Sequence, residues 1–164
     1  MKVSQLLLLL SCFALAAGCE GTLENRVVLE GGRLSLVLPD GWVVEEEERG
    51  AATVISGPQG RLSIALMDEV PSAKEPRDLL TAVGAMTTDF TVREEADFPA
   101  EAVMGKEFIV TDSGGGAPHM GAVYVFDRDG KLCILTFATK LGELGDLLAT
   151  FRAAAGSLRF LTVQ

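Results

Sequence analysis

Several residue types that often carry chemistry are scarce in this chain of 164 residues. It contains a single histidine, a single tryptophan, a single tyrosine and three cysteines. One histidine does not make a zinc site without cysteines or carboxylates near it in the fold. Basic residues are also few, 14 against 23 acidic ones, which gives a net charge of −9. Because such a chain repels phosphate backbones, its composition argues against nucleic-acid binding through a basic patch.

The apolar run at the N-terminus is too short to span a bilayer. It extends from Leu6 to Ala17 and has twelve residues, whereas a spanning helix needs roughly 20. Lys2 precedes the run, and small residues follow it up to Cys19. A basic start, a short apolar run and a small-residue ending are typical of a secretory signal.

The ending of this run, Leu15-Ala16-Ala17-Gly18-Cys19, resembles the lipobox of bacterial lipoproteins. The resemblance implies that the Cys19 thiol is acylated, as with palmitate, and that cleavage makes Cys19 the first residue. Ala16 departs from the pattern, because the family most often has leucine three residues before the cysteine. An ordinary secretory signal with a chance cysteine and an uncleaved interfacial helix remain alternatives.

These features predict the organisation of the chain. Residues 1–18 form the signal peptide, residues 19–26 a short polar tether, and residues 27–164 a single domain, which is a usual domain length. Lys2 is the only charged residue removed with the signal, so the net charge falls to −10. The expected location is the bacterial cell envelope. Glu20, which is not the aspartate of inner-membrane retention, favours the periplasmic face of the outer membrane in a Gram-negative cell.

The cysteines leave no internal disulfide. Cys12 departs with the signal and Cys19 is acylated in the lipoprotein interpretation, so Cys133 alone remains. It lies in the apolar run Lys131 to Leu135. We expect it to be a small buried hydrophobic residue and not a nucleophile.

Apolar residues alternate along several segments, which is the period of half-buried strands. The segments are 33–38, 42–44, 52–56, 61–66, 103–110, 120–126 and 131–139. Pro39-Asp40-Gly41, 57–60 and 127–130 supply turns between them. The two segments 123–126 and 132–135 are apolar on both faces and are predicted to be central strands.

Two segments have helical spacing instead. Leu79, Val83, Met86 and Phe90 recur along one helical face after Pro76, and a second helix is expected over 141–155. Between them, 91–101 is acidic and suggests a short edge strand followed by a loop at Phe98-Pro99. The sequence therefore predicts an α+β fold, an antiparallel β-sheet with helices packed on it.

From Val27 to Phe160 this order resembles the Mog1/PsbP-like fold, and within it the DcrB-type lipoproteins. The residues that carry the resemblance are Leu38-Pro39-Asp40-Gly41-Trp42 and Ser157-Leu158-Arg159-Phe160. The resemblance implies a protein that binds other proteins and is not an enzyme. By the same likeness, Trp42 is expected to pack in the core after its turn and not to serve as a ligand platform.

The residues that could carry chemistry do not form a recognisable motif. Ser113, His119 and Asp112 lie close in sequence, but Ser113 sits in no Gly-x-Ser-x-Gly elbow. Gly114-Gly115-Gly116 lacks the Lys-Ser/Thr of a phosphate loop and is expected to be a turn. Acidic residues also gather in two places, at Glu45-Glu46-Glu47-Glu48 and at Glu94, Glu95, Asp97 and Glu101. Each group could suggest a cation site, but both are expected to be solvated faces.

The expected function is a non-catalytic, membrane-anchored accessory module that binds an envelope protein. No catalytic residue, metal site or cofactor is predicted, and Cys19, the lipidation site, is the only site residue. The alternative is a small-molecule or lipid-binding lipoprotein with a pocket between the sheet and the 79–90 helix.

Overall fold

The computed structural model describes residues 25–46, 52–69, 75–82, 89–113 and 118–162. The signal peptide, Cys19, most of the tether and Gly114-Gly115-Gly116 lie outside the described residues. In the part of the chain that is described, no helix is long and apolar enough to cross a membrane.

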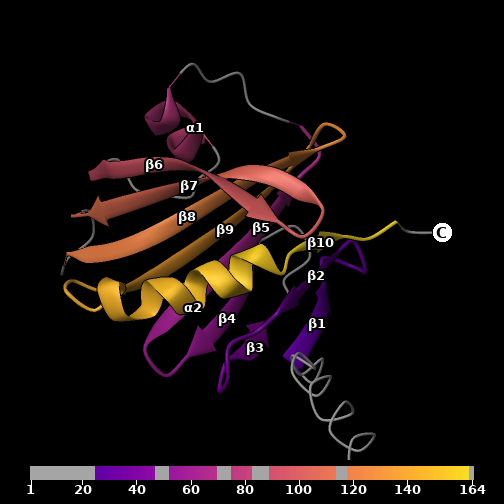
Figure 1. Cartoon of the computed structure of the whole chain (residues 1–164), viewed down its shortest axis with the longest axis horizontal. Coiled ribbons are helices and arrows are strands. Elements are labelled where there is room, and N and C mark those ends of the chain that lie inside the picture. The colour runs from indigo at the N-terminus through magenta and orange to yellow at the C-terminus, as the bar shows by residue number, and fades with distance from the viewer. Residues whose placement is uncertain (1–24, 47–51, 70–74, 83–88, 114–117, 163–164) are drawn as a thin grey trace, which may run out of the picture.

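A seven-stranded antiparallel sheet forms the body of the fold, in the order β3-β4-β5-β9-β8-β7-β6 (Figure 1). Its strands are β3 Val43–Glu46, β4 Thr53–Gly57, β5 Gly60–Met67, β6 Phe90–Ala100, β7 Val103–Asp112, β8 His119–Arg128 and β9 Lys131–Lys140. Consecutive hairpins join β4 to β5, β6 to β7 and β8 to β9. The antiparallel α+β fold expected from the sequence is confirmed.

The centre of the sheet is apolar on both faces, as the sequence predicts. Along β8, Tyr124 and Phe126 point to one core and Val123 and Val125 to the other. The turn between β8 and β9 has positive φ at Asp129 (55°) and Gly130 (77°). This is the conformation of the tight type I′ turn, which matches the twist of a hairpin.

A second, three-stranded sheet covers one end of the first. It has the order β1-β2-β10, with β1 Arg26–Leu29, β2 Leu34–Val37 and β10 Arg159–Phe160. Leu34 and Leu36 of β2 are fully buried in the larger of the two cores. Figure 1 shows this small sheet beside the C-terminal end of the long helix.

The long helix α2, Leu144–Gly156, lies across one face of the seven-stranded sheet (Figure 1). Its buried residues are Leu144, Phe151, Ala154 and Ala155. Ser157 ends the helix, because its hydroxyl donates to the Ala154 carbonyl at 2.7 Å and accepts the Val37 N–H at 2.8 Å. One side chain thus closes the helix and ties it to β2.

The middle of the chain differs from the sequence prediction. The helix α1 spans Pro76–Ala82, and Phe90 begins strand β6, so a helix running to Phe90 is wrong. Val83 and Met86 lie outside the described residues. Phe90 and Leu80 are nevertheless buried in the same small core. Phe90, which the sequence placed on the helical face, therefore reaches that core from the sheet.

The segment 91–101 also differs. Instead of a short strand and a loop, β6 runs for 11 residues, and Phe98 and Pro99 are paired with Gly105 and Met104. Most of its side chains are exposed on both faces, since it is the edge strand. An exposed edge does not show apolar alternation, and a register shift between Val92 and Glu94 further obscures the period.

Candidate functional site

The sequence motif around Trp42 builds one wall of a groove. The backbone N–H of Trp42 donates to the Pro39 carbonyl at 3.1 Å, and Gly41 has a positive φ of 78° that closes the turn. The Asn25 amide donates to Asp40 at 2.9 Å and fixes the turn to the start of β1. The turn thereby directs the indole inward.

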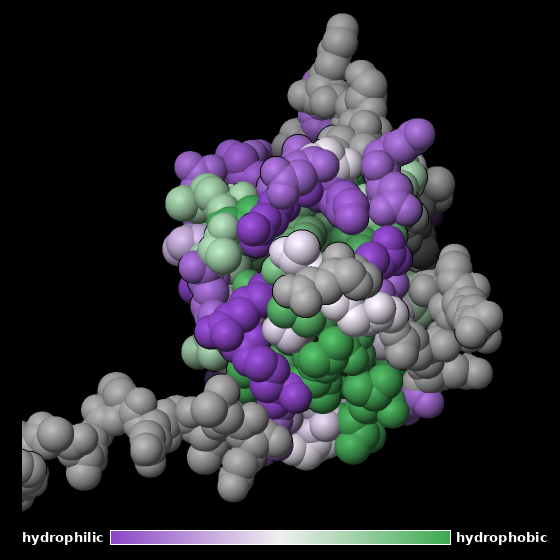
Figure 2. All heavy atoms as spheres, turned by 90° about the vertical axis from the view of Figure 1, so that its right-hand side faces the viewer, coloured by the Kyte–Doolittle hydropathy of each residue, from purple (hydrophilic) through white to green (hydrophobic). Residues whose placement is uncertain are grey.

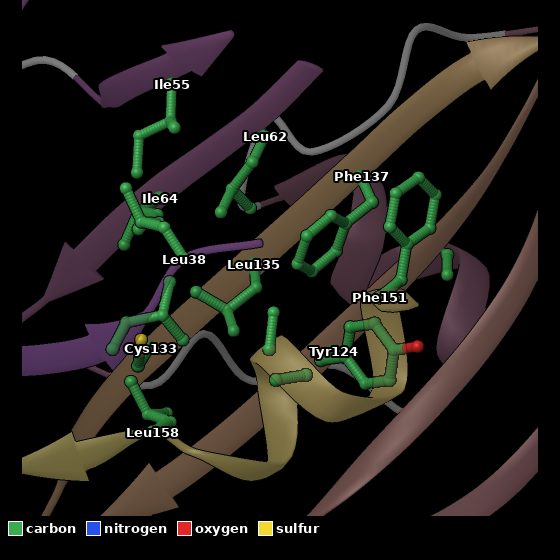
Figure 3. Close-up of a cluster of buried hydrophobic side chains, with 14 of the residues drawn as sticks. Leu38, Ile55, Leu62, Ile64, Tyr124, Cys133, Leu135, Phe137, Phe151 and Leu158 are labelled. Atoms are coloured by element: carbon green, nitrogen blue, oxygen red, sulfur yellow. The ribbon is translucent and has the colours of Figure 1, made fainter. Parts of the chain in front are cut away.

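Trp42 joins an aromatic cluster under α2. Its ring lies edge-on to Phe137 at 6.2 Å and to Phe151 at 6.0 Å, and those two rings stack at 4.5 Å. Tyr124 lies edge-on to Phe137 at 5.7 Å. Figure 3 shows Phe137, Phe151 and Tyr124 near one another, to the right of the buried leucines. Trp42 is 9% exposed, so the sequence-based expectation of a core tryptophan is confirmed.

A groove of about 530 Å³ lies beside this cluster, and we call it the Trp42 groove. It runs between the 38–42 turn, the β4–β5 turn and the outer side of α2. Its apolar surface comes from Trp42, Leu147 and Ala153, and polar side chains stand at its rim. The rim residues are Asn25, Asp40, Gln59 and Thr150.

A second groove, of about 590 Å³, lies on the sheet face opposite α2, and we call it the His119 groove. Register places Arg61, Ala138, Gly121 and Val110 in one row across its floor. A side chain at Gly121 would put its Cβ 2.5 Å from the Phe137 carbonyl oxygen. The close neighbouring strand therefore requires glycine there and keeps the floor low.

The two grooves meet at the β4–β5 turn, because Pro58 and Gln59 line both. The buried hydroxyl of Thr139 holds this turn in place. It lies 2.9 Å from the Gln59 carbonyl oxygen and 3.2 Å from Glu143 Oε2. The turn at 57–60 agrees with the sequence prediction, whereas the floor row was not foreseen from the sequence, since it depends on strand register.

His119 and Asp112 are cross-strand partners at the ends of β8 and β7, and both line the His119 groove. His119 is exposed and Ser113 follows the end of β7, so the expected loop position of His119 becomes a strand end. No hydrogen bond joins His119 to a serine or a carboxylate among the interactions found for the described residues. The arrangement that would suggest a hydrolase is not present in them.

Glu95, Asp97 and Glu101 are paired with cations instead of converging on one point. Lys106 lies 3.2 Å from Glu95 and 2.9 Å from Asp97. Glu101 pairs with Arg26 and Arg159, of which Arg159 contributes most to holding its pKa below the ordinary value. Within the described ranges, no cluster of three or more histidine, cysteine or acidic residues could hold a metal ion.

One ion pair lies partly inside the fold. Arg152 of α2 donates to Glu107 of β7 at 2.9 and 2.7 Å, and Glu107 is 4% exposed. Burial is the largest influence on the pKa of Glu107 and acts to raise it, but the Arg152 hydrogen bonds, the Tyr124 hydroxyl and the Arg152 charge together lower the pKa. Tyr124, the cross-strand partner of Glu107, has a buried hydroxyl without a hydrogen bond of good geometry. Burial, followed by the neighbouring Glu107 carboxylate, raises the pKa of Tyr124, so its phenol stays neutral.

The remaining candidate, Cys133, is fully buried and unpaired. Burial raises the pKa of its thiol well above the ordinary range. A thiol in that state is neither a ready nucleophile nor a metal ligand. The expectation that Cys133 is a small core residue is confirmed.

Solved structures share this fold, although no family model and no curated protein sequence matches the chain. The solution structure of cyanobacterial PsbP (CyanoP) from Synechocystis has 17% identity and a TM-score of 0.58, covering 87% of this chain and 97% of that one. The Ran-binding protein Mog1p from Saccharomyces cerevisiae has 12% identity and a TM-score of 0.53, covering 80% of this chain and 84% of that one. At these identities the likeness shows the fold.

Proposed function

We propose that this chain, which has the Mog1/PsbP-like fold, is a non-catalytic accessory module of the bacterial cell envelope. It is anchored by lipidated Cys19 and binds another envelope protein through the Trp42 groove. The groove itself is the observation that carries the proposal. Both sequence segments that underlie the fold resemblance bear on it, since 38–42 forms its wall and 157–160 fixes the end of α2.

The groove has the composition of a protein contact site. An apolar centre of Trp42, Leu147 and Ala153 lies within a polar rim, and this is the usual arrangement of interfaces. The tryptophan is held rigid by Phe137 and Phe151, so little conformational entropy is lost when a partner side chain packs on it. The likeness to a Ran-binding protein agrees with a fold suited to protein contacts.

The tether brings the groove near the membrane. Asn25 lines the groove and is separated from Cys19 by a short segment. Six residues at full extension reach about 20 Å, so a lipidated Cys19 would hold the groove in the headgroup region or just beyond it. The proposed location is the periplasmic face of the outer membrane, if the cell is Gram-negative.

A second surface on the tether side is apolar. Figure 2 shows hydrophobic atoms gathered below the centre of the face that carries the small sheet. Val28 of β1 is 59% exposed, and Leu161, after β10, is 36% exposed. Exposed apolar patches are common at interaction sites, and this one lies on the strand that follows the tether.

The anchor is tested first by Cys19→Ser, followed by fractionation of cells and mass spectrometry of the N-terminal peptide. We expect the wild-type peptide to begin with an acylated Cys19 and the variant to leave the membrane fraction. The core lies beyond the tether, so the soluble variant should remain folded. Retention of a folded variant in the membrane would show that the lipid is not the anchor.

The groove is tested with a photo-crosslinking amino acid placed at Ala153 or, as a control, at Ala149. Both alanines are exposed on α2, but only Ala153 lines the groove. We expect one envelope protein to be crosslinked from position 153 and not from 149. Equal capture from both positions, or from neither, would contradict the groove as the contact site.

A matched pair of variants gives an independent test. Ala153→Arg fills the groove, whereas Ala149→Arg adds the same side chain outside it, and arginine is well tolerated in helices. We expect chemical crosslinking to the envelope protein to be lost in Ala153→Arg and kept in Ala149→Arg. Crosslinks to lipid instead of protein from position 153 would contradict protein binding at the Trp42 groove. A second candidate function rests on the other groove.

That second candidate function is the binding of a small molecule or lipid. The observation that favours it is the His119 groove, whose volume of about 590 Å³ falls within the range of small-molecule sites. Most of its lining lies on the opposite sheet face from α2, although Pro58 and Gln59 line both grooves. Variants outside the β4–β5 turn therefore test the two functions separately.

A further inference from the structure

Basic side chains without partners gather in the His119 groove. In the described part of the chain, no hydrogen bond, ion pair or ring contact involves the side chains of Arg61, Lys131 and Lys140. Arg61 and Lys140 line this groove, and Lys131 lines another hollow. The other described basic residues, Arg26, Arg33, Arg77, Arg93, Lys106, Arg128, Arg152 and Arg159, each have a side-chain interaction.

Register brings these cations to one place. Lys140 lies directly opposite His119, and Arg61 lies opposite Ala138, two residues before Lys140 on the same strand. Diagonal neighbours of this kind are about 7 Å apart on one sheet face. Long side chains at Arg61 and Lys140 can therefore reach a single anionic group, with His119 beside it.

The groove also contains two carboxylates, and neither is free. Glu143 lies 3.2 Å from the Thr139 hydroxyl, and Asp112 has an interaction of its own. Their negative charges raise the cost of bringing in a dianion, because like charges in one cavity repel. A ligand with a single negative charge suits this balance better than a phosphate monoester.

The floor beside the cations is small and apolar. Gly121, Ala138 and Val110 form the row that continues from Arg61 across three strands. Since strands are about 4.8 Å apart, this row spans roughly 10 to 15 Å. Ala138 is half-buried, and Gly121 and Val110 are buried at the base of the groove. A hydrocarbon chain that follows the row would pack mainly on Ala138.

We propose that the His119 groove binds a small amphipathic carboxylate, such as a medium-chain fatty acid. The carboxylate lies between the Arg61 guanidinium and the Lys140 ammonium, and the hydrocarbon covers Gly121, Ala138 and Val110. The proposal names a ligand class for the second candidate function and does not depend on protein binding at the Trp42 groove.

The test is titration of the mature protein with decanoate below its micelle concentration, followed by calorimetry and by amide chemical shifts. We expect saturable 1:1 binding, with the largest shifts at Gly121 and Ala138. Decanol has the same chain without the charge, decyl phosphate has a dianionic head, and acetate lacks the chain. We expect each of these to bind at least about 10-fold more weakly. Decanol loses the charge-assisted contact, acetate loses the burial of the chain, and the second charge of decyl phosphate is repelled by Glu143 and Asp112.

The variants separate the site from general charge effects. Arg61→Gln combined with Lys140→Gln should weaken decanoate binding by about 10-fold or more. Lys131→Gln removes the third unpartnered cation, which lies outside the groove, and should change binding by less than about twofold. Ala138→Leu occupies the floor, leaves both cations in place and should also weaken binding about 10-fold.

Several outcomes would overturn the proposal. They are no saturable binding of decanoate, equal affinity for decanol, tighter binding of decyl phosphate, or equal weakening by Lys131→Gln. Thermal unfolding of each variant identifies any that fails to fold. Arg61 and Lys140 are exposed strand residues, so the charge variants should keep the wild-type melting temperature within a few degrees.

Discussion

Replacing Gly57 with alanine should dislodge Trp42. Gly57 ends strand β4, and a Cβ added there would lie 2.2 Å from Cε2 and 2.4 Å from Cδ2 of the Trp42 indole. Carbon atoms in contact prefer about 3.5 to 4.0 Å, so the indole must move by more than 1 Å. The glycine is needed because the ring lies directly on the backbone.

The expected loss of stability follows from the contacts of the indole. Moving it disturbs two edge-on pairs, with Phe137 at 6.2 Å and with Phe151 at 6.0 Å. Each aromatic pair contributes about 0.5 to 1.5 kcal/mol, and overpacking a core costs about 1 to 3 kcal/mol. We expect Gly57→Ala to lower the free energy of unfolding by about 2 to 3 kcal/mol.

Trp42 is the only tryptophan, so urea titration can be followed by its fluorescence and, in parallel, by far-UV circular dichroism. We expect a lower midpoint and a red-shifted native emission, because the indole gains contact with water. Gly145→Ala is the matched control, since nothing lies within 4 Å of a Cβ there and alanine in a helix is favoured by about 0.5 to 1 kcal/mol. An unchanged midpoint and unchanged emission in Gly57→Ala would refute the packing argument.

Three further predictions concern charge and the thiol groups. Arg152→Met leaves Glu107 buried and unpaired and should cost about 2 kcal/mol at pH 7. Burial acts to raise the pKa of Glu107, but the Arg152 hydrogen bonds, the Tyr124 hydroxyl and the Arg152 charge together lower it. In the wild type this stabilisation is therefore present above the unfolded pKa of about 4.3 and is lost as the pH falls through the lower folded value. A difference between variant and wild type that grew towards pH 4 would contradict this. Iodoacetamide should label Cys133 only after unfolding, because burial raises the pKa of the thiol. Peptide mass spectrometry measures the labelling. Labelling of Cys133 in the native protein would show that its site opens. The same experiment should never label Cys19 in the mature protein, and a labelled Cys19 would mean that it carries no acyl chain.

The fold could be predicted where one face of a segment is buried and the other is not. Leu62 and Ile64 of β5 are buried and alternate with the more exposed Arg61 and Ser63. The apolar runs of β8 and β9 correctly predicted central strands, because strands covered on both faces lack alternation. Trp42 was placed correctly through the resemblance to the Mog1/PsbP-like fold, which implies that the tryptophan after this turn packs in the core.

The parts that could not be predicted depend on contacts between distant segments. Phe90 fits a helical spacing with Leu79, yet it reaches the same core from strand β6. The spacing of apolar residues does not distinguish a helix from a strand here, since either element would bury Phe90 on the same side. The pairing of Arg152 with Glu107 spans 45 positions, and neither residue type indicates its partner. The floor of the His119 groove requires the register of four strands, which alternation alone leaves open.

The edges of the sheet limit where a partner protein can bind. Edge strand β6 carries Glu94, Glu95 and Asp97, a proline at position 99 and a register shift, all features that prevent another strand from pairing there. The opposite edge, β3, has four residues, and a very short edge strand discourages the pairing of another strand. Among the described strands, both edges of the seven-stranded sheet are therefore poor sites for an added strand. This agrees with the proposed contact through side chains in the Trp42 groove, which Asn25 of the tether lines.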